Sequence, residues 1–411
     1  MIKFNTNKMI INMISIYVVV LFFYGIIVKF TIWNPTLFAM KTYIPEGILI
    51  FCTFLSIITC KLKLNYKILI MFIYSLFLIC INYIFNGANM QSFYWWRDLY
   101  IPLFSSMILL QREFTEEEIK VLFKKLIFIA KIFLIFGLGL AIIEQIKGDI
   151  WTSEFYTGYS FYGQDTYSKI KIAHNMGLLR APSLTGNFST FAYYSCFSLF
   201  LILMEKKNKK VFNIFWIIVS ILCTILSTNK SAIISLIVVL IIYKSVDIRK
   251  KNKKINRFLI FLIFSLIILM LIFNNSNIFS EDSSYTGGFL QRFDVWNNII
   301  KNINMIQVII PYKTFMYGSG SSGEFGNSFF DNIYLYCFVT QGIIGFIIWI
   351  DYLRSLFKNL INGYEGKIKL FIKNVFYFFL IVGLTSNTIQ GHGFFCLMII
   401  LFSILYKFNS K

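Results

Sequence analysis

The chain has 411 residues, of which 57% are hydrophobic and only 14% are charged. Soluble domains are roughly half apolar and about one-quarter charged, so this composition excludes an ordinary soluble protein. The net charge of +20 would suit a nucleic-acid-binding protein, but the basic residues form no aromatic-basic module of the kind that single-strand binders use.

The apolar residues form runs about as long as a helix needs to cross the ~30 Å hydrocarbon core of a bilayer. We therefore predict an all-α polytopic membrane protein with about 12 transmembrane helices, organised as a single domain over residues 1–411. In chain order the predicted spans are 9–28, 44–60, 67–86, 93–110, 124–146, 187–204, 212–228, 231–243, 258–274, 331–351, 372–389 and 393–408.

The distribution of basic residues predicts the orientation of these spans. An even number of spans places both termini on the same side, and most of the 39 Lys and Arg residues fall on that side. They include the stretches "MEKKNKK" (204–210) and "YKSVDIRKKNKKINR" (243–257). The positive-inside rule then predicts that both termini are cytoplasmic. The positive charge reflects orientation and attraction to anionic lipids rather than binding to nucleic acid.

Two segments on the predicted outer side are long, at about 147–186 and about 275–330. Loops of such length are usually functional or disordered. The 7 cysteines form no CxxC pair, and there are only 2 histidines. Because no metal-ligand spacing occurs, we predict neither a metal site nor another cofactor.

The stretch "LLRAPSLTGNFSTFAYY" (178–194) contains an arginine just before a predicted span. Pro182 and Gly186 interrupt regular backbone there, so Arg180 is expected at the outer membrane boundary. One interpretation is a snorkelling interface arginine. The other is an anion-binding residue, because a guanidinium offers forked donors that match phosphate oxygens.

Two further cations stand on the outer side. Lys230 lies in "STNKSAIISL" (227–236), a tight turn between spans, where the positive-inside rule disfavours lysine. It either snorkels or binds phosphate as a point charge. Arg292 and Asp294 in "FLQRFDVW" form a surface ion pair, or the arginine faces a lipid-linked phosphate.

The stretch "YGSGSSGEFGNSFFDNIYL" (317–335) joins a glycine-rich loop to the tenth predicted span. Gly318 and Gly320 allow the backbone to turn sharply and to approach a ligand closely. Asp331, followed by Asn332, stands at the start of the span. Its carboxylate either caps the helix or accepts a proton from an attacking hydroxyl.

One pair of opposite charges falls inside a predicted span. In "YWWRDLY", Arg97 and Asp98 lie near the outer end of the fourth span. Charges inside a membrane are candidates for function, but adjacent opposite charges also satisfy one another. We therefore expect a local ion pair.

In order and spacing, these segments together resemble the O-antigen polymerase and ligase superfamily, of Wzy and WaaL type. The stretch "RAPSLTGNFSTFAYY" is similar to the family's arginine-containing outer segment. "STNKSAIISL" is similar to its "SxSRxxxxxL" turn, with Lys230 in place of the usual arginine. "LQRFDVWNNII…YGSGSSG…FFDNIYLYCFVTQGIIGFIIW" is similar to "RxxxW…GxGxG…(D/H)NxYL…xxGxxGxxxW". The resemblance covers residues 178–350, and the N-terminal spans match only in being hydrophobic.

This resemblance implies a helical, GT-C-like fold in the bacterial cytoplasmic (inner) membrane, with an active site that faces outward. It implies an inverting, metal-independent transfer of glycan from an undecaprenyl diphosphate carrier to a sugar hydroxyl of another lipid-linked repeat unit. Donors aimed at the departing diphosphate would stabilise the transition state. The implied catalytic residues are Asp331, Arg292 and Arg180. The implied substrate-binding residues are Arg180, Lys230, Arg292, Asn332, Tyr334, Gly318 and Gly320.

Three functions stay open. Ligase-type members tend to have a histidine where this chain has Asp331, which favours a repeat-unit polymerase over an O-antigen ligase. A flippase for the same lipid-linked units would also have many spans, but it would be expected to carry charges along a cavity within them. The implied partners are undecaprenyl-diphosphate-linked oligosaccharides, membrane lipids and a chain-length regulator.

Overall fold

The computed structural model describes residues 6–31, 34–40, 43–60, 66–87, 90–156, 174–175, 178–205, 210–248, 296–301, 303–312, 332–389 and 393–406. This part of the chain is predominantly α-helical, with one pair of two-residue strands, which confirms the predicted helical class. The helices are α1 (Thr6–Phe22), α2 (Tyr24–Thr31), α3 (Pro35–Met40), α4 (Ile44–Thr59), α5 (Tyr66–Asn86), α6 (Met90–Leu109), α7 (Glu116–Phe155), α8 (Phe188–Ile202), α9 (Lys210–Leu226), α10 (Lys230–Ile248), α13 (Met305–Ile309), α14 (Ile333–Gly363), α15 (Gly366–Gly383) and α16 (Phe394–Ile404), with the short 3₁₀ helix η2 (Ser183–Thr185) and the antiparallel strands β1 (His174–Asn175) and β2 (Leu178–Leu179).

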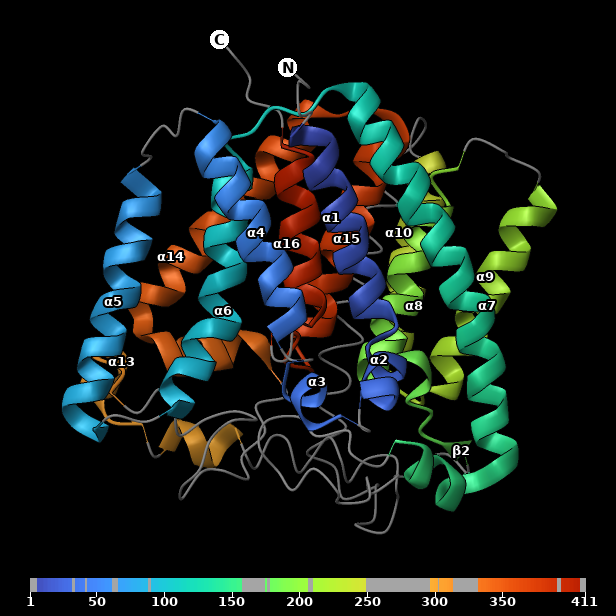
Figure 1. Cartoon of the computed structure of the whole chain (residues 1–411), viewed down its shortest axis with the longest axis horizontal. Coiled ribbons are helices and arrows are strands. Elements are labelled where there is room, and N and C mark those ends of the chain that lie inside the picture. The colour runs from blue at the N-terminus through green and yellow to red at the C-terminus, as the bar shows by residue number, and fades with distance from the viewer. Residues whose placement is uncertain are drawn as a thin grey trace.

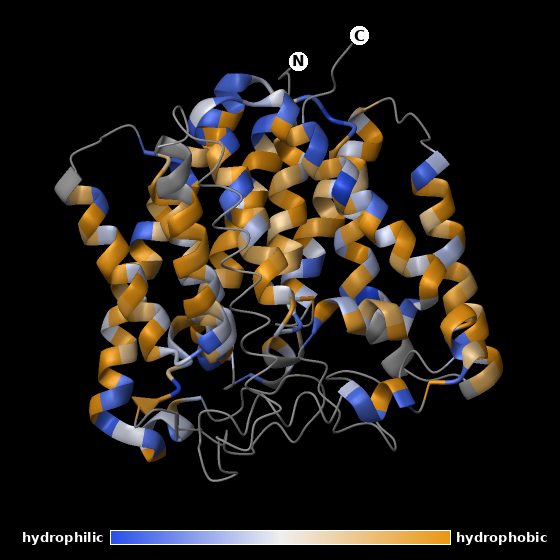
Figure 2. Cartoon of the chain, turned by 180° about the vertical axis from the view of Figure 1, so that it is seen from behind, coloured by the Kyte–Doolittle hydropathy of each residue, from blue (hydrophilic) through white to orange (hydrophobic). Residues whose placement is uncertain are grey.

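The long helices run side by side as a bundle, and both chain termini lie at the same end of it (Figure 1). The opposite end carries α2, α3 and β2, and we call it the distal end. Hydrophobic residues follow the middle of the long helices, whereas hydrophilic residues gather toward both ends of the bundle (Figure 2). This distribution is the one expected for a bundle that crosses a bilayer.

Among the described helices, α5, α7 and α14 are each long and apolar enough to cross a membrane, judged by length and composition. The pair α1 and α2 adds a fourth if its two parts, bent by 77°, form one broken span. The shorter apolar helices α4, α8, α9, α10 and α16 coincide with further predicted spans. The ninth predicted span, 258–274, lies outside the described residues. The structure therefore supports membrane-spanning character.

The interior of the bundle is apolar and rich in aromatic rings. Every residue of α16 is buried, and α8 is buried from Phe191 to Ile202. The outward faces of peripheral helices instead expose large apolar side chains, such as Ile73 of α5, Phe136 of α7 and Phe215 of α9. Such faces would promote aggregation in water, but they are suited to contact with lipid.

Helix α7 extends further than the sequence indicated. It begins at a capping box, in which Thr115 and Glu118 exchange hydrogen bonds. It then continues past Gly148, whose φ of 79° breaks the helix, and ends at Phe155. The first residues of the predicted outer segment 147–186 are therefore helical, up to Phe155. Glycine allows the left-handed backbone at the break, so the chain can turn and resume a helix there.

Candidate functional site

The site is built around residues 178–187, which we call the η2 segment. Two neighbouring side chains of α7 hold it. Gln145 donates to the Leu179 carbonyl at 2.6 Å and accepts from the Leu179 N–H at 3.1 Å. The fully buried Glu144 accepts from the Ser183 N–H at 3.1 Å and from the Tyr156 hydroxyl at 2.6 Å. The end of the predicted loop, residues 178–186, is therefore packed against the bundle.

The backbone of the η2 segment is sharply turned. Ser183 has a φ of 48°, which is uncommon for a residue with a side chain. Its hydroxyl donates to the Gly137 carbonyl at 2.8 Å, and Glu144 holds its N–H, so the surrounding contacts compensate for the strain. Asn187 then caps α8 by accepting from the N–H groups of Ser189 and Thr190. These contacts give the segment a defined path.

Arg180 extends from this segment and is half-buried. The carbon of its guanidinium lies 3.7 Å from the centroid of the Phe188 ring. A cation above an aromatic face is held by the quadrupole of the ring. Because stacking engages the flat face of the guanidinium, its N–H donors point outward in the plane of the group. That is the geometry needed to bind phosphate oxygens.

A hydrogen bond ties the η2 segment to the turn that carries Lys230. The Ala181 N–H donates to the Leu226 carbonyl at 3.1 Å, at the end of α9. In the turn, Thr228 has a φ of 52°, and Asn229 accepts from the Ala232 N–H at 3.0 Å. The tight turn predicted before Lys230 is confirmed. It brings Lys230, the first residue of α10, to the same end of the bundle as Arg180.

A second turn, formed by residues 384–389 between α15 and α16, connects this region to α14. Thr385 donates through its hydroxyl to the Ser231 hydroxyl at 2.6 Å. The Asn332 side-chain amide donates to the Leu384 carbonyl at 3.1 Å. The 384–389 turn is therefore bonded to the start of α10 on one side and to the start of α14 on the other.

The cap of α14 is Asn332. Its side-chain oxygen accepts from the N–H groups of Tyr334 and Leu335, both at 3.0 Å. The alternative in which Asp331 caps this helix is therefore wrong. Tyr334 donates through its hydroxyl to the Leu380 carbonyl at 2.9 Å. Both Asn332 and Tyr334 thus have structural partners, and their contacts with substrate stay a prediction.

Four of the predicted site residues lie outside the described residues: Asp331, Arg292, Gly318 and Gly320. The structure brings the other three regions together at the distal end. Arg180 is linked through Ala181 to the α9–α10 turn, and the 384–389 turn links Ser231 to Asn332. Segments more than one hundred residues apart in sequence therefore form one connected surface.

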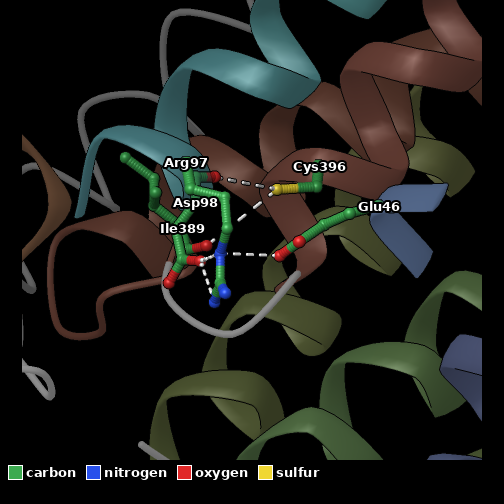
Figure 3. Close-up of polar contacts among 5 residues, drawn as sticks. All are labelled: Glu46, Arg97, Asp98, Ile389 and Cys396. Carbon is green, nitrogen blue, oxygen red and sulfur yellow. Dashed lines mark hydrogen bonds and ion pairs between the residues drawn. The ribbon is translucent and has the colours of Figure 1, made fainter. Parts of the chain in front are cut away.

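A buried ionic cluster adjoins this surface (Figure 3). Arg97 Nε lies 2.8 Å from Glu46 Oε1, and Arg97 Nη2 lies 3.1 Å from Asp98 Oδ1. The ion pair expected between Arg97 and Asp98 is confirmed. Glu46 was missed, although a carboxylate in an apolar run is itself a signal of a partner. Glu144 is likewise a carboxylate in an apolar run, which again indicates a partner.

The cluster of Glu46, Arg97 and Asp98 lies against the 384–389 turn. The Cys396 sulfur is 3.9 Å from the Asp98 carbonyl oxygen and 3.9 Å from the Ile389 carbonyl oxygen (Figure 3). Tyr24 of α2 lies near the charged side chains of the cluster. Helix α2 also contacts the η2 segment, so it lies between the cluster and the residues around Arg180.

In the α9–α10 turn and the 384–389 turn, three polar atoms are buried and have no hydrogen-bond partner within the described part of the chain. They are Thr228 Oγ1, Asn387 Nδ2 and Thr388 Oγ1. A buried polar group left without a partner costs about 1–3 kcal/mol, so native proteins rarely accumulate them without a reason.

The described residues contain no group of three or more His, Cys, Asp or Glu side chains that could hold a metal ion. No protein-family model matches the chain, and no curated protein is significantly similar to it.

Proposed function

We propose that this chain is a membrane glycosyltransferase that polymerises undecaprenyl-diphosphate-linked oligosaccharide repeat units into a surface polysaccharide. One observation supports this proposal above the others. The motif segments around Arg180, Lys230 and Asn332, which the resemblance singles out by sequence order, are connected by hydrogen bonds at the distal end. Transfer between lipid-linked substrates needs such a site at the end of the bundle, where the lipid phosphate meets the water phase.

The leaving group in this reaction is a lipid diphosphate, which departs with concentrated negative charge. Arg180 and Lys230 supply positive charge from two neighbouring segments, and Arg292 is proposed to act with them. Donors placed where negative charge develops stabilise the transition state more than the ground state. The stacking of Arg180 on Phe188 supports this role, because it orients the guanidinium before substrate binds.

The acceptor is a sugar hydroxyl of a second lipid-linked unit. Its oxygen attacks the anomeric carbon from the face opposite the diphosphate, and the bond from that carbon to the phosphate oxygen breaks with its electron pair. The hydroxyl proton passes to a base, for which we propose Asp331. The capping of α14 by Asn332 supports this assignment, because Asp331 is not needed as the helix cap.

The proposed site faces the outside of the bacterial cytoplasmic membrane, with both termini in the cytoplasm. The polyprenyl tail of the carrier stays in the lipid, and the diphosphate lies at the boundary, within reach of long basic side chains. Transfer to a different acceptor, as in a ligase, uses the same leaving group and is an outcome of the test.

The test is the length of the surface glycan in the native strain. A deletion strain is complemented with wild type, Arg180→Ala, Arg180→Lys or Lys230→Ala, and the polysaccharide is separated on a gel. We expect Arg180→Ala to remove the ladder of long chains, because losing a transition-state donor lowers the rate roughly 100-fold or more. Arg180→Lys should restore short chains only. Lys230→Ala should shorten the chains.

Lys67→Ala is the matched control. Lys67 forms an exposed ion pair with Asp351, 2.6 Å apart, at the end of the bundle that carries the termini, so this variant should restore the full ladder. All variants must reach wild-type levels in the membrane. If the deletion strain makes long chains that are not attached, the protein is a ligase. If lipid-linked units accumulate on the cytoplasmic face, it is a flippase and the proposal is overturned.

A further inference from the structure

The geometry points to a saccharide-binding subsite on the 384–389 turn, formed by Asn387 and Thr388 together with Thr228 of the α9–α10 turn. This inference rests on the proposed function and deepens it, because it states which residues bind the sugar part of the repeat unit. The sequence resemblance carried no residue over to this turn. The subsite follows from the three buried polar atoms in these two turns.

Local hydrogen bonds hold the 384–389 turn in place. The Asn387 side-chain oxygen accepts from the Ile389 N–H at 3.1 Å, which fixes the orientation of the amide. The Thr388 carbonyl accepts from the Phe395 N–H at 3.1 Å, at the start of α16. Thr388 is 1% exposed and Thr228 is 2% exposed. These groups are therefore ordered and withdrawn from bulk water.

The two turns are neighbours in space. The hydrogen bond between Thr385 and Ser231 joins the 384–389 turn to the first turn of α10. Thr228 precedes Ser231 by three residues, and Thr388 follows Thr385 by three. The same turn reaches the ionic cluster through Ile389. The Cys396 sulfur lies 3.9 Å from the carbonyl oxygen of Ile389 and 3.9 Å from that of Asp98 (Figure 3).

The chemistry of the three groups selects a neutral, hydroxylated ligand. A threonine hydroxyl both donates and accepts, and an amide NH₂ donates twice. Sugar hydroxyls offer the complementary mixture of donors and acceptors. A diphosphate instead favours cations, which the neighbouring segments supply as Arg180 and Lys230. The distal end thus divides into a cationic part for the diphosphate and a neutral part for the sugar.

Replacing threonine by valine separates a binding role from a structural one. The two side chains have nearly the same shape, so the substitution removes the hydroxyl and adds no large cavity. A buried hydroxyl without a partner destabilises the folded protein, so its removal should leave the melting temperature unchanged or raise it. If the hydroxyl binds a sugar, the same substitution weakens substrate binding. The two effects have opposite signs.

The experiment uses the purified full-length chain in lipid nanodiscs and its native lipid-linked repeat unit. We expect Thr388→Val, Asn387→Leu and Thr228→Val each to raise the KM for the repeat unit about tenfold, which is the effect of losing one good hydrogen bond. Their melting temperatures should equal or exceed that of the wild type.

Ser198→Ala is the matched control. The Ser198 hydroxyl is also buried without a partner in the described part of the chain. It lies ten residues into α8, about 15 Å along the helix from its distal end. The variant should keep the wild-type KM.

Two competitors distinguish sugar from phosphate. The oligosaccharide released from the strain's own polysaccharide should inhibit Thr388→Val more weakly than wild type, whereas inorganic pyrophosphate should inhibit both equally. Pyrophosphate should inhibit Arg180→Lys more weakly than wild type, whereas the oligosaccharide should inhibit both equally. If the three subsite variants keep the wild-type KM, or if the threonine variants melt at lower temperature, the subsite is overturned and the proposed function stands. If the wild type makes no polymer from its repeat unit, the proposed function itself fails.

Discussion

Arg97 lies at the centre of the buried ionic cluster near the distal end. Its guanidinium binds Glu46 of α4 and Asp98 of its own helix, and all three side chains are at most 10% exposed. It also lies 5.5 Å from the centroid of the Tyr43 ring. Removing one partner from a buried ionic group leaves the others uncompensated, which is far more costly than never having had the charges.

We therefore predict that Arg97→Met lowers the free energy of unfolding by about 3–5 kcal/mol. Thermal unfolding of the purified protein in detergent would measure this loss. The triple variant Arg97→Met, Glu46→Gln and Asp98→Asn removes all three charges and should regain much of the stability. A triple variant less stable than Arg97→Met would contradict the assignment of the cluster as one electrostatic unit.

At the start of α14, two neighbouring residues are both of a type that caps helices. Asp331 and Asn332 are adjacent, and both residue types cap helices equally well. Asn332 has an extended φ of −149°, and its side-chain oxygen accepts from the N–H groups of Tyr334 and Leu335. The cap of α14 therefore belongs to Asn332.

Among the elements, α2 and the η2 segment pack with no space between them. A Cβ added at Gly25 would lie 2.8 Å from the Gly186 Cα and 2.8 Å from the Thr185 carbonyl carbon, with the Gly186 nitrogen closer still. These are backbone atoms, which cannot swing aside as a side chain can. The close approach of α2 therefore depends on glycine at this position and helps to place the η2 segment that carries Arg180.

We predict that Gly25→Ala destabilises the protein by roughly 1–3 kcal/mol and lowers polymer length, because it pushes the η2 segment away from α2. Gly139→Ala is the matched control, since a Cβ there meets nothing within 4 Å on the surface of α7. That variant should gain about 0.5–1 kcal/mol in helix stability. Melting temperature and glycan length would be measured for both, and equal behaviour would contradict the packing argument.

For the whole molecule, orientation in the membrane is the property that the proposed function needs most. The helices α8, α9 and α10 run alternately along the bundle, so the turn at Asn229 and the segment at Glu205 lie at opposite ends (Figure 1). We predict that alkaline phosphatase fused after Asn229 is active, and that fusions after Glu205 or at the C-terminus are inactive. Green fluorescent protein fused at the C-terminus should be fluorescent. The opposite pattern would place Arg180 and Lys230 in the cytoplasm and contradict an outward-facing site.

The positions of most helices follow from local sequence. Runs of apolar residues are local features, and a bilayer demands a run of a certain length wherever the chain crosses it. Local rules did not show that the chain resumes a helix beyond the break at Gly148 in α7. Local sequence patterns also indicated Arg180, Lys230 and the Asp-Asn pair, because polar groups beside apolar runs stand out without any knowledge of packing.

Which of these residues meet depends on the packing of the helices. The bonds from Ala181 to Leu226, from Thr385 to Ser231 and from Asn332 to Leu384 join segments that are distant in sequence. The pairing of Glu46 with Arg97 and the clamp of Glu144 on Ser183 are equally non-local. Such contacts depend on how whole helices pack against each other. Hydrophobic periodicity shows which face of a helix is apolar, but it does not say which other helix will cover that face.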